Sequence, residues 1–354
     1  MYKGKTISVA MATYNGEKNI EEQIVSICSN QVKPDEIIIS DDGSSDKTLE
    51  VVHRTIRSMD TSGIHFVVLT DNANHGYAGN FAWALMHSTG DVVFLSDQDD
   101  IWTDNKIQSI MDVFHKYPDA NLVFHDARIF YDNTNEWLDD VFNQFLNTKA
   151  MHFNDDDVAK VCRDQFLSDA ATLTIAQGMV IAAKREFVQS SLPLPRGAAQ
   201  DNWLTFRAVC LDTCYYLNQS LTAYRLHDNN VAGRKGQRRS VFVKAHRVLR
   251  RLSKIADVVG YHEYICSMIK EMEANGLESS KAFRDLTACK EISDELLSAF
   301  RSTRASGAYK VIHLYFTNNR YHNSGREQFI HQLWSVVRFG KKDRAYFLKE
   351  YKNG

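Results

Sequence analysis

The stretch VVFLSDQDDIW, residues 92–102, places three carboxylates within four residues directly after an apolar run. A short apolar run bounded by polar residues is typical of a strand in the interior of a sheet. Asp97, Asp99 and Asp100 repel one another at neutral pH, and this repulsion is offset when a cation binds among them. The stretch therefore predicts a buried strand followed by an acidic loop, and it raises the question of what the acids bind.

The first 130 residues repeat this pattern, with helical segments between the strands. We expect further strands at Ile7 to Met11, Glu36 to Ser40, His65 to Thr70 and Leu122 to His125. Apolar stripes at helix spacing lie between them, with Leu49, Val52, Ile56 and Met59 in one and Ile107, Ile110, Met111, Phe114 and Tyr117 in another. This alternation predicts an α/β fold of the Rossmann-like, doubly wound kind, a mostly parallel sheet flanked by helices.

Composition and charge narrow the class of protein. Lys and Arg total 42 against 44 Asp and Glu, so the basic excess of a general nucleic-acid binder is missing and no nucleic-acid partner is expected. No segment reaches the ~20 apolar residues of a membrane span, and the first residues hold too short an apolar stretch for a signal peptide. The 6 cysteines form no CxxC pair, which favours reduced thiols and a cytoplasmic protein.

Polar residues follow four of the predicted strands. Besides the acidic loop, these segments are Thr13-Tyr14-Asn15-Gly16, Asp41-Asp42-Gly43-Ser44-Ser45-Asp46 and the later His75-Gly76-Tyr77-Ala78-Gly79-Asn80. Ligands of such sheets bind at the carboxyl ends of the strands, so we expect the four segments to converge on one polar site. The glycine spacing matches neither the dinucleotide fingerprint nor the P-loop, which disfavours a Rossmann dehydrogenase.

The acidic loop is a candidate metal site. Residues two apart in an extended chain point the same way, so Asp97 and Asp99 can present both carboxylates to one side. Mg²⁺ or Mn²⁺ would take one or two such ligands and complete its shell with water and substrate phosphates. A capped turn before the next helix is the competing interpretation, because Asp is common in front of helices.

The second strand end allows two interpretations as well. Gly43 permits a tight turn, and Ser44, Ser45 or Asp46 can cap the helix that follows. A cap needs one acceptor, so Asp41 or Asp42 remains to accept a hydrogen bond from a uracil or thymine imide or from a ribose hydroxyl. The segment is predicted either to cap a helix or to bind a nucleoside.

Taken together, VAMATYNGEKNIEEQIVSI, IIISDDGSSDKT, NHGYAGNFAWAL and FLSDQDDIW resemble the nucleotide-sugar domain of family 2 glycosyltransferases, inverting enzymes of the GT-A fold. The resemblance continues through AAQDNWLTFRAV and YRLHDNNVAG and covers roughly residues 5–233. Within this family, the sequence is similar above all to bacterial rhamnosyltransferases and related enzymes of surface-polysaccharide assembly. It implies a donor such as dTDP-rhamnose or a UDP-hexose, and a glycan or lipid-linked glycan as acceptor.

The resemblance also implies roles for particular residues. Its nucleotide-sugar contacts are carried over here to Thr13, Tyr14, Asn15, Asp41, Asp42, Gly76, Asn80, Asp97, Gln177 and Gly178, the last two falling at the floor of the acceptor site. Metal and diphosphate would be held by Asp97 and Asp99, with Asp100 as an alternative, and His227 would approach them. Asp201 would be the catalytic base, although Gln200 stands where the family often has a second acid.

The chain changes character near residue 234. Nine Lys or Arg fall between Arg234 and Lys254 with no Asp or Glu among them, and helical patterns follow. Lys244, Arg247, Arg251 and Lys254 share one helical face opposite an apolar stripe, which suits either an anionic membrane surface or packing on the protein itself. We therefore expect a catalytic domain over residues 1–233 and a mainly helical extension over 234–354. The extension would contact the inner face of the membrane, the acceptor or a second subunit of a homodimer.

Two other functions fit parts of the pattern. A sugar nucleotidyltransferase also uses a metal and an α/β sheet, but no basic glycine-rich phosphate loop stands near the N-terminus. A non-catalytic glycan-binding or scaffolding module needs no base beside a metal pair, so the joint presence of Asp97, Asp99 and Asp201 disfavours it. The sequence therefore favours a metal-dependent inverting glycosyltransferase.

Overall fold

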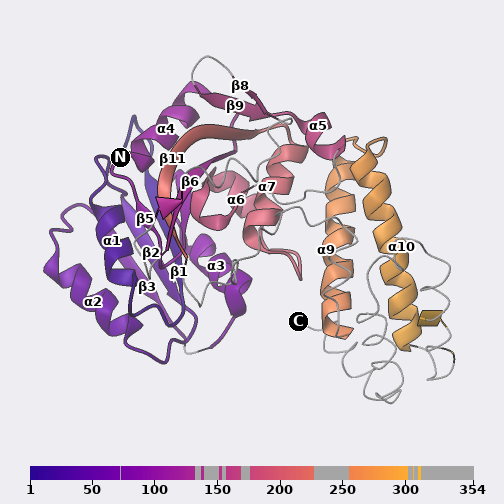
Figure 1. Cartoon of the computed structure of the whole chain (residues 1–354), viewed down its shortest axis with the longest axis horizontal. Coiled ribbons are helices and arrows are strands. Elements are labelled where there is room, and N and C mark those ends of the chain that lie inside the picture. Colours follow the sequence, from indigo (N-terminus) through magenta and orange to yellow (C-terminus); the bar gives the residue numbers. More distant parts are fainter. Residues whose placement is uncertain are drawn as a thin grey trace. The chain divides into compact units, whose positions relative to one another are not determined.

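We describe a computed structural model of the chain, shown in Figure 1. It describes residues 1–71, 73–131, 137–138, 151–153, 157–168, 176–226, 255–301, 306 and 310–311. The backbone divides into two compact units. One comprises Met1–Arg163, Thr174–Leu194 and Ala199–Ser240, and the other Asp164–Leu173, Pro195–Ala198 and Val241–Gly354. The predicted boundary between residues 233 and 234 lies outside the described residues.

The first unit is built on one mixed sheet. Its strands are β1 (Ile7–Thr13), β2 (Glu36–Asp41), β3 (His65–Leu69), β4 (Val92–Ser96), β5 (Ile101–Trp102), β6 (Leu122–Tyr131), β7 (Trp137–Leu138), β8 (Met151–Phe153), β9 (Val158–Val161), β10 (Ile181–Lys184) and β11 (Cys214–Leu226). The main order is β3-β2-β1-β4-β10-β6-β11-β9-β8. The first four strands of this order run parallel, whereas β10 is antiparallel to both of its neighbours.

Helices cover both faces of this sheet. They are α1 (Ile20–Cys28), α2 (Thr48–Ser58), α3 (Gly76–His87), α4 (Lys106–Lys116), α6 (Arg185–Ser190) and α7 (Gln200–Cys210), together with the short 3₁₀ helix η2 (Gly178–Val180). Figure 1 shows α1 and α2 on one side of the parallel strands and α3, α6 and α7 on the other. The doubly wound α/β fold predicted from the sequence is confirmed.

Alternation along β1 explains this layering. Ile7, Val9 and Met11 are fully buried and belong to the core that α1, α2 and α4 close. Ala10, one position out of phase, is equally buried, and α3 packs on β1 and β2. A strand buried on both faces is expected where parallel strands have helices on either side. The carboxyl ends of the strands are thereby left as the polar edge of the unit.

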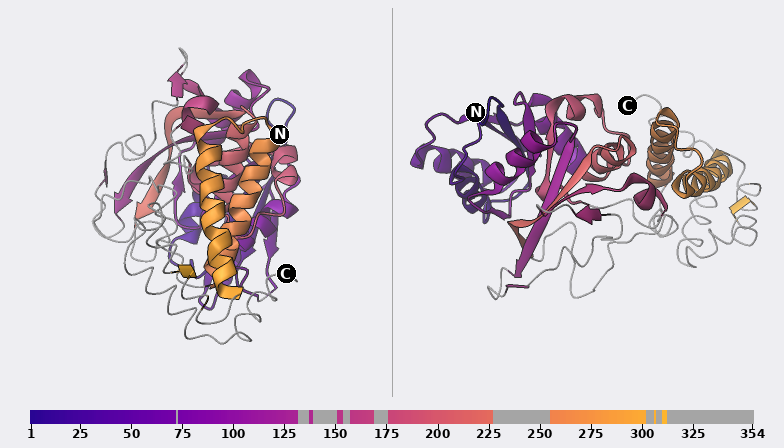
Figure 2. Two further views of the ribbon diagram at one scale, coloured as in Figure 1. Left: turned by 90° about the vertical axis from the view of Figure 1, so that its right-hand side faces the viewer. Right: turned by 90° about the horizontal axis from the view of Figure 1, so that it is seen from above.

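The second unit contains the helices α9 (Ile255–Ala274) and α10 (Lys281–Arg301), and α5 (Arg163–Ser168) begins at its border. Figure 2 shows α9 and α10 side by side in both views. They bury apolar side chains, among them Ile265, Met268, Leu286, Ile292 and Leu296. The expected helical pattern of this part of the chain is confirmed. In the described part of the chain, none of the helices is long and apolar enough to span a bilayer.

Candidate active site

The ends of β2, β1 and β4 meet at one edge of the sheet. Thr13 pairs with Asp41, and Met11 pairs with Ser96, so the three parallel strands finish close to one level. The polar segments predicted to converge therefore follow neighbouring strands. This edge holds Thr13-Tyr14-Asn15 (the TYN segment), the adjacent aspartates Asp41 and Asp42, and the acidic loop.

Gln98 ties the end of β1 to the acidic loop. Its Oε1 accepts hydrogen bonds from Thr13 Oγ1 at 2.6 Å and from the Tyr14 amide at 2.9 Å, and its Nε2 donates to the Tyr14 carbonyl at 3.0 Å. A Cβ added at Gly16 would lie 2.1 Å from Gln98 Oε1, so only glycine fits there without displacing this side chain. Gln98 was not predicted as a site residue, and its one visible signal in the sequence is its place between two aspartates.

Hydrogen bonds also join the TYN segment to the residues that follow β2. Asn15 adopts φ 50°, a left-handed conformation that Asn tolerates better than most residues. Its amide donates to Ser44 Oγ at 2.8 Å, and its Oδ1 accepts from the Ser45 amide at 2.8 Å. Asp41 accepts from both the amide and the hydroxyl of Ser44. Asp41 is thus the acceptor that closes the turn.

Asp42 and Asn80 connect the start of α3 to the sheet. The Asp42 carboxylate accepts from the His75 amide at 2.5 Å. Asn80 is 3% exposed, its Oδ1 accepts from Ser40 Oγ and its Nδ2 donates to the Thr13 carbonyl. The Asn80 amide therefore positions α3 against β1 and β2 from within.

Gly76 opens α3 at φ 71°. A Cβ added there would meet no atom within 4 Å, so the backbone conformation, not space, is what requires glycine. The left-handed turn lets the chain enter α3 immediately after the segment that bonds Asp42.

The acidic loop carries more negative charge than its surroundings neutralise. Burial, with the nearby charges of Asp99 and Asp201, raises the pKa of Asp97 to about 8. Burial, with the nearby charges of Asp99 and Asp97, raises the pKa of Asp100 well above its ordinary value. Asp100 is fully buried, and its Oδ1 accepts from the Arg225 amide at 3.2 Å. A cation that binds here would relieve this strain on the carboxylates.

Lys106 is a buried lysine near these acids, and nothing in the sequence predicted this position. Its Nζ donates to the Met179 carbonyl at 2.8 Å and to Thr222 Oγ1 at 2.9 Å, and it lies 3.8 Å from the centre of the Trp102 ring. Burial lowers the pKa of Lys106, whereas the charges of Asp100 and Asp97 oppose that shift. Lys106 therefore joins α4, η2 and β11 beneath the acidic loop.

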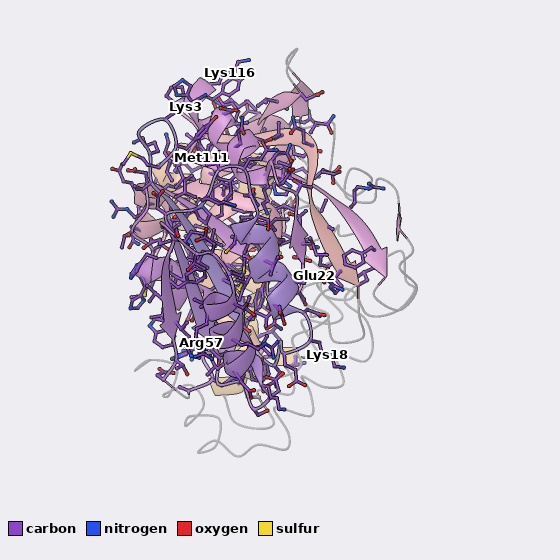
Figure 3. The ribbon with its side chains drawn as sticks, turned by 90° about the vertical axis from the view of Figure 1, so that its left-hand side faces the viewer. Lys3, Lys18, Glu22, Arg57, Met111 and Lys116 are labelled. Carbon is purple, nitrogen blue, oxygen red and sulfur yellow. The ribbon has the colours of Figure 1, made fainter. Side chains whose placement is uncertain are left out.

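Arg225 holds the end of β11 at the same loop. Its Nε donates to the Asp99 carbonyl at 2.8 Å, and its guanidinium lies 4.7 Å from the centre of the Phe130 ring. The guanidinium also forms an ion pair with Glu22, which Figure 3 labels on α1. β11 ends at Leu226, and His227 lies outside the described residues, so the structure does not place this predicted metal ligand.

Asp201 stands in the first turn of α7. Burial raises the pKa of its carboxyl to about 6, although hydrogen bonds from the Asn202 and Gly178 amides oppose the shift. The Asn202 amide lies 2.7 Å from Asp201 Oδ1. Gln177 directly precedes η2, so the predicted QG pair reaches Asp201 through the Gly178 backbone. The charge of Asp201 contributes to the raised pKa of Asp97, although the two residues come from distant segments of the chain.

The donor set fits a hard divalent cation. Within the described residues, no three His, Cys, Asp or Glu side chains already form a metal cage. Mg²⁺ and Mn²⁺ in phosphate-handling sites need only one or two protein carboxylates, because water and phosphate oxygens supply the other ligands. Asp97 and Asp99 would supply two such carboxylates, and a bound cation would favour the ionised form of Asp97, whose pKa is raised by burial and by the charges of Asp99 and Asp201.

The first unit thus has a Rossmann-like sheet with an acidic loop after β4 and a buried carboxylate, Asp201, in the first turn of α7. Residues 8–167 match the family described as Glycosyl transferase family 2. This match, together with the curated relatives, shows that the chain is a glycosyltransferase.

Curated relatives agree with this assignment. The chain is 28% identical over 236 residues to the dTDP-rhamnosyl transferase RfbG of Shigella flexneri, which covers 63% of this chain and 73% of the relative. It is 26% identical over 227 residues to an uncharacterized glycosyltransferase of Nostoc sp., which covers 63% of this chain and 66% of the relative. It is 30% identical over 102 residues to the UDP-Glc:alpha-D-GlcNAc-diphosphoundecaprenol beta-1,3-glucosyltransferase WfgD of Escherichia coli, which covers 29% of this chain and 38% of that relative.

Among solved structures, residues 1–349 of TarS from S. aureus in complex with UDP-GlcNAc cover 94% of this chain and 90% of that chain. The TM-score is 0.49 and the identity 15%. At this level the overlap adds nothing to the fold described above.

Proposed function

We propose that the protein is a metal-dependent inverting glycosyltransferase of bacterial cell-surface polysaccharide synthesis. The donor would be a nucleoside-diphosphate sugar, dTDP-rhamnose or a UDP-hexose, and the acceptor a hydroxyl of a glycan or lipid-linked glycan. The names of two relatives support this range, since one is a dTDP-rhamnosyl transferase and the other transfers glucose from UDP-Glc to a diphosphoundecaprenol-linked sugar.

One observation carries the proposal: burial raises the pKa of Asp201 to about 6, and the charge of Asp201 in turn raises the pKa of Asp97. A general base is most effective when its pKa lies near the working pH. Asp201 would take the proton of the acceptor hydroxyl while that oxygen attacks the anomeric carbon. The nucleoside diphosphate would leave from the opposite side, and the anomeric configuration would invert.

Asp97 and Asp99 would hold the metal, with His227 following directly after β11. Bound there, Mn²⁺ or Mg²⁺ would supply positive charge to the leaving diphosphate. Asp100 suits this role less well, because it is fully buried and accepts a hydrogen bond from the Arg225 amide. Lys106 would keep the loop in place from below by its bonds to Met179 and Thr222.

The nucleoside would lie on the ends of β1 and β2, against the TYN segment. Tyr14 is 49% exposed there, so its ring can cover a base. Thr13, Asn15, Asp41, Asp42 and Asn80 already bond within the protein and would shape this surface, while Gly76, Gln177 and Gly178 would let the donor and the acceptor approach the backbone.

Product analysis tests this function against the two alternatives. The purified protein, Mn²⁺, dTDP-rhamnose or UDP-glucose and a membrane lipid extract would be incubated, and the released nucleotide identified. A glycosyltransferase releases nucleoside diphosphate, whereas a nucleotidyltransferase consumes or releases pyrophosphate. Release of neither, by a folded sample that still binds glycans, would favour the non-catalytic module and contradict our proposal.

We also propose that the basic segment from Arg234 to Lys254 brings the enzyme to an anionic membrane surface on the cytoplasmic side. The segment lies outside the described residues, and its charge supports the proposal. Sedimentation with liposomes that contain anionic lipid, but not with neutral liposomes, is the expected result. Equal sedimentation with both would instead favour packing on the protein or in a homodimer.

A further inference from the structure

The side chains of Tyr77 and Gln200 meet at the candidate active site. Gln200 Nε2 donates a hydrogen bond to the Tyr77 hydroxyl at 3.0 Å. Tyr77 comes from the first turn of α3, and Gln200 is the first residue of α7, directly before Asp201. Gln200 is fully buried, while Tyr77 is 40% exposed. The family resemblance assigned no role to either residue.

The direction of this hydrogen bond leaves the Tyr77 hydroxyl hydrogen free of Gln200. An amide nitrogen can only donate, so the Tyr77 oxygen is the acceptor, and its own hydrogen remains to be donated elsewhere. Although Tyr77 as a whole is 40% exposed, its phenol oxygen is buried. This burial, with the charges of Asp97 and Asp201, raises the pKa of the phenol well above its ordinary value. The hydroxyl therefore stays protonated at working pH and remains a donor.

Close packing fixes the position of the hydroxyl. A Cβ added at Gly178 would lie 3.3 Å from Gln200 Nε2 and 3.6 Å from the Tyr77 oxygen, so the glycine backbone lies directly beside the pair. The Tyr77 ring packs edge-on against Phe81 of the same helix, with centroids 5.2 Å apart. Gln200 Oε1 is buried without a hydrogen-bond partner among the described residues and so offers a second polar atom.

Asp97 and Asp201 are the charged groups that act on the Tyr77 hydroxyl. In the proposed function, on which this inference rests, Asp97 marks the diphosphate side of the reaction and Asp201 the acceptor side. The group between them is the transferred sugar. We propose that Tyr77, oriented by Gln200, donates a hydrogen bond to a hydroxyl of the donor sugar and thereby helps to select that sugar.

Calorimetry of the full-length protein with Mn²⁺ and without acceptor tests this role directly. The Tyr77→Phe variant keeps the ring against Phe81 and removes only the hydroxyl. It should bind dTDP and UDP within about twofold of the wild-type affinity. Its affinity for the sugar nucleotide that the wild type prefers, dTDP-rhamnose or UDP-glucose, should fall about fivefold to tenfold, the usual effect of one lost hydrogen bond.

Tyr2→Phe is a matched control. The Tyr2 hydroxyl donates a hydrogen bond to Asp112 at 2.8 Å. Tyr2 precedes β1 in the chain, whereas the candidate site lies at the other end of that strand. This variant also loses one phenol hydrogen bond, and it should bind nucleotides and sugar nucleotides as the wild type does. A loss for the sugar nucleotide in both variants would point to a general structural effect and overturn the inference.

Gln200→Glu provides a second variant. A carboxylate at this position accepts a hydrogen bond from the Tyr77 hydroxyl, so the hydroxyl can no longer donate to the sugar, and the same selective loss is expected. If the wild type binds no nucleotide at all, the proposed function fails as well. If the wild type binds both nucleotide and sugar nucleotide and Tyr77→Phe binds both equally well, the inference alone is wrong.

Discussion

Asp97 and Asp201 lie on separate segments, β4 with its acidic loop and the first turn of α7, yet the charge of Asp201 contributes to the raised pKa of Asp97. Burial is the larger cause for both residues. In the proposed mechanism the two carboxylates would have distinct tasks, because Asp97 would bind a cation and Asp201 would accept a hydroxyl proton. The following predictions test that division.

Replacing the proposed base should stop transfer and spare donor binding. Asp201→Asn should lower kcat by ~10²–10⁴-fold, the usual contribution of a general base. Its affinity for the nucleotide should change little, as calorimetry can measure. Asp212→Asn is the control, because Asp212 follows α7 and pairs with Lys160 at the surface. Wild-type transfer by Asp201→Asn would remove this residue from the mechanism.

The rate should depend on pH through the ionisation of Asp201. Only the carboxylate can accept a proton, and burial raises its pKa to about 6. The value of kcat/KM should therefore rise with pH through about 6 and level off above it. A rate that stays constant from about pH 5 to 8 would contradict the assignment.

The metal-free protein should lose stability as pH rises. The folded-state pKa of Asp97, about 8, and that of Asp201, about 6, both exceed the unfolded value of 3.8. Protonation therefore stabilises the fold fully below the unfolded pKa, and this stabilisation is lost between about pH 4 and 8. Thermal melting in EDTA should show a smaller decline for Asp97→Asn than for the wild type, and Mn²⁺ should reduce the wild-type decline. An equal decline of the melting temperature with pH in both proteins would show that ionisation of Asp97 does not destabilise the metal-free fold.

Lys106 should be important for folding. Lys106→Met removes the donor to the Met179 carbonyl and Thr222 and leaves the buried acids without their cation. The free energy of unfolding should fall by about 3 kcal/mol. Lys116→Met, at the exposed end of the same helix and labelled in Figure 3, should change it by less than about 0.5 kcal/mol. Urea unfolding measures both variants, and similar values for the two would be evidence against a structural role for the buried ammonium.

Gly16 and Gln98 should be energetically coupled. Gly16→Ala alone forces Gln98 away from Thr13 and Tyr14, because the new Cβ would lie 2.1 Å from Gln98 Oε1. In the Gln98→Ala background the same change should cost far less. The double-mutant cycle should give a coupling of about 1–2 kcal/mol. Additive effects would mean that the two side chains do not compete for this space.

The start of each core strand was predictable from the sequence. β1, β2, β3, β4 and β6 begin at the residues expected from their apolar runs. β3 ends one residue earlier than expected, at Leu69, whereas the other four strands extend further. In β1 and β2 the parallel pairing continues into the polar residues Thr13 and Asp41. β10 was not predicted, since its place between β4 and β6 depends on pairing with distant strands.

The acidic residues of the candidate site were predictable from the sequence, whereas the polar residues that hold the surrounding elements together were less so. Asp97 and Asp201 belong to patterns visible in the sequence, whereas a lysine that opens a helix is usually solvated, so nothing local indicates that Lys106 is buried. The Asn80 amide turned out to face β1 and β2, because a buried amide in α3 must find partners in the nearest strands. Which polar groups bond within the protein is decided by the tertiary fold.

Calorimetric titration of the purified protein with dTDP, UDP, GDP and ADP, first with Mn²⁺ and then with EDTA, tests the central claim most directly. We predict that dTDP or UDP binds when Mn²⁺ is present and that EDTA weakens this binding at least tenfold, because the acidic loop and the diphosphate share the cation. A folded sample that binds none of the four nucleotides, or that binds one equally well in EDTA, would contradict the metal-dependent sugar-nucleotide site.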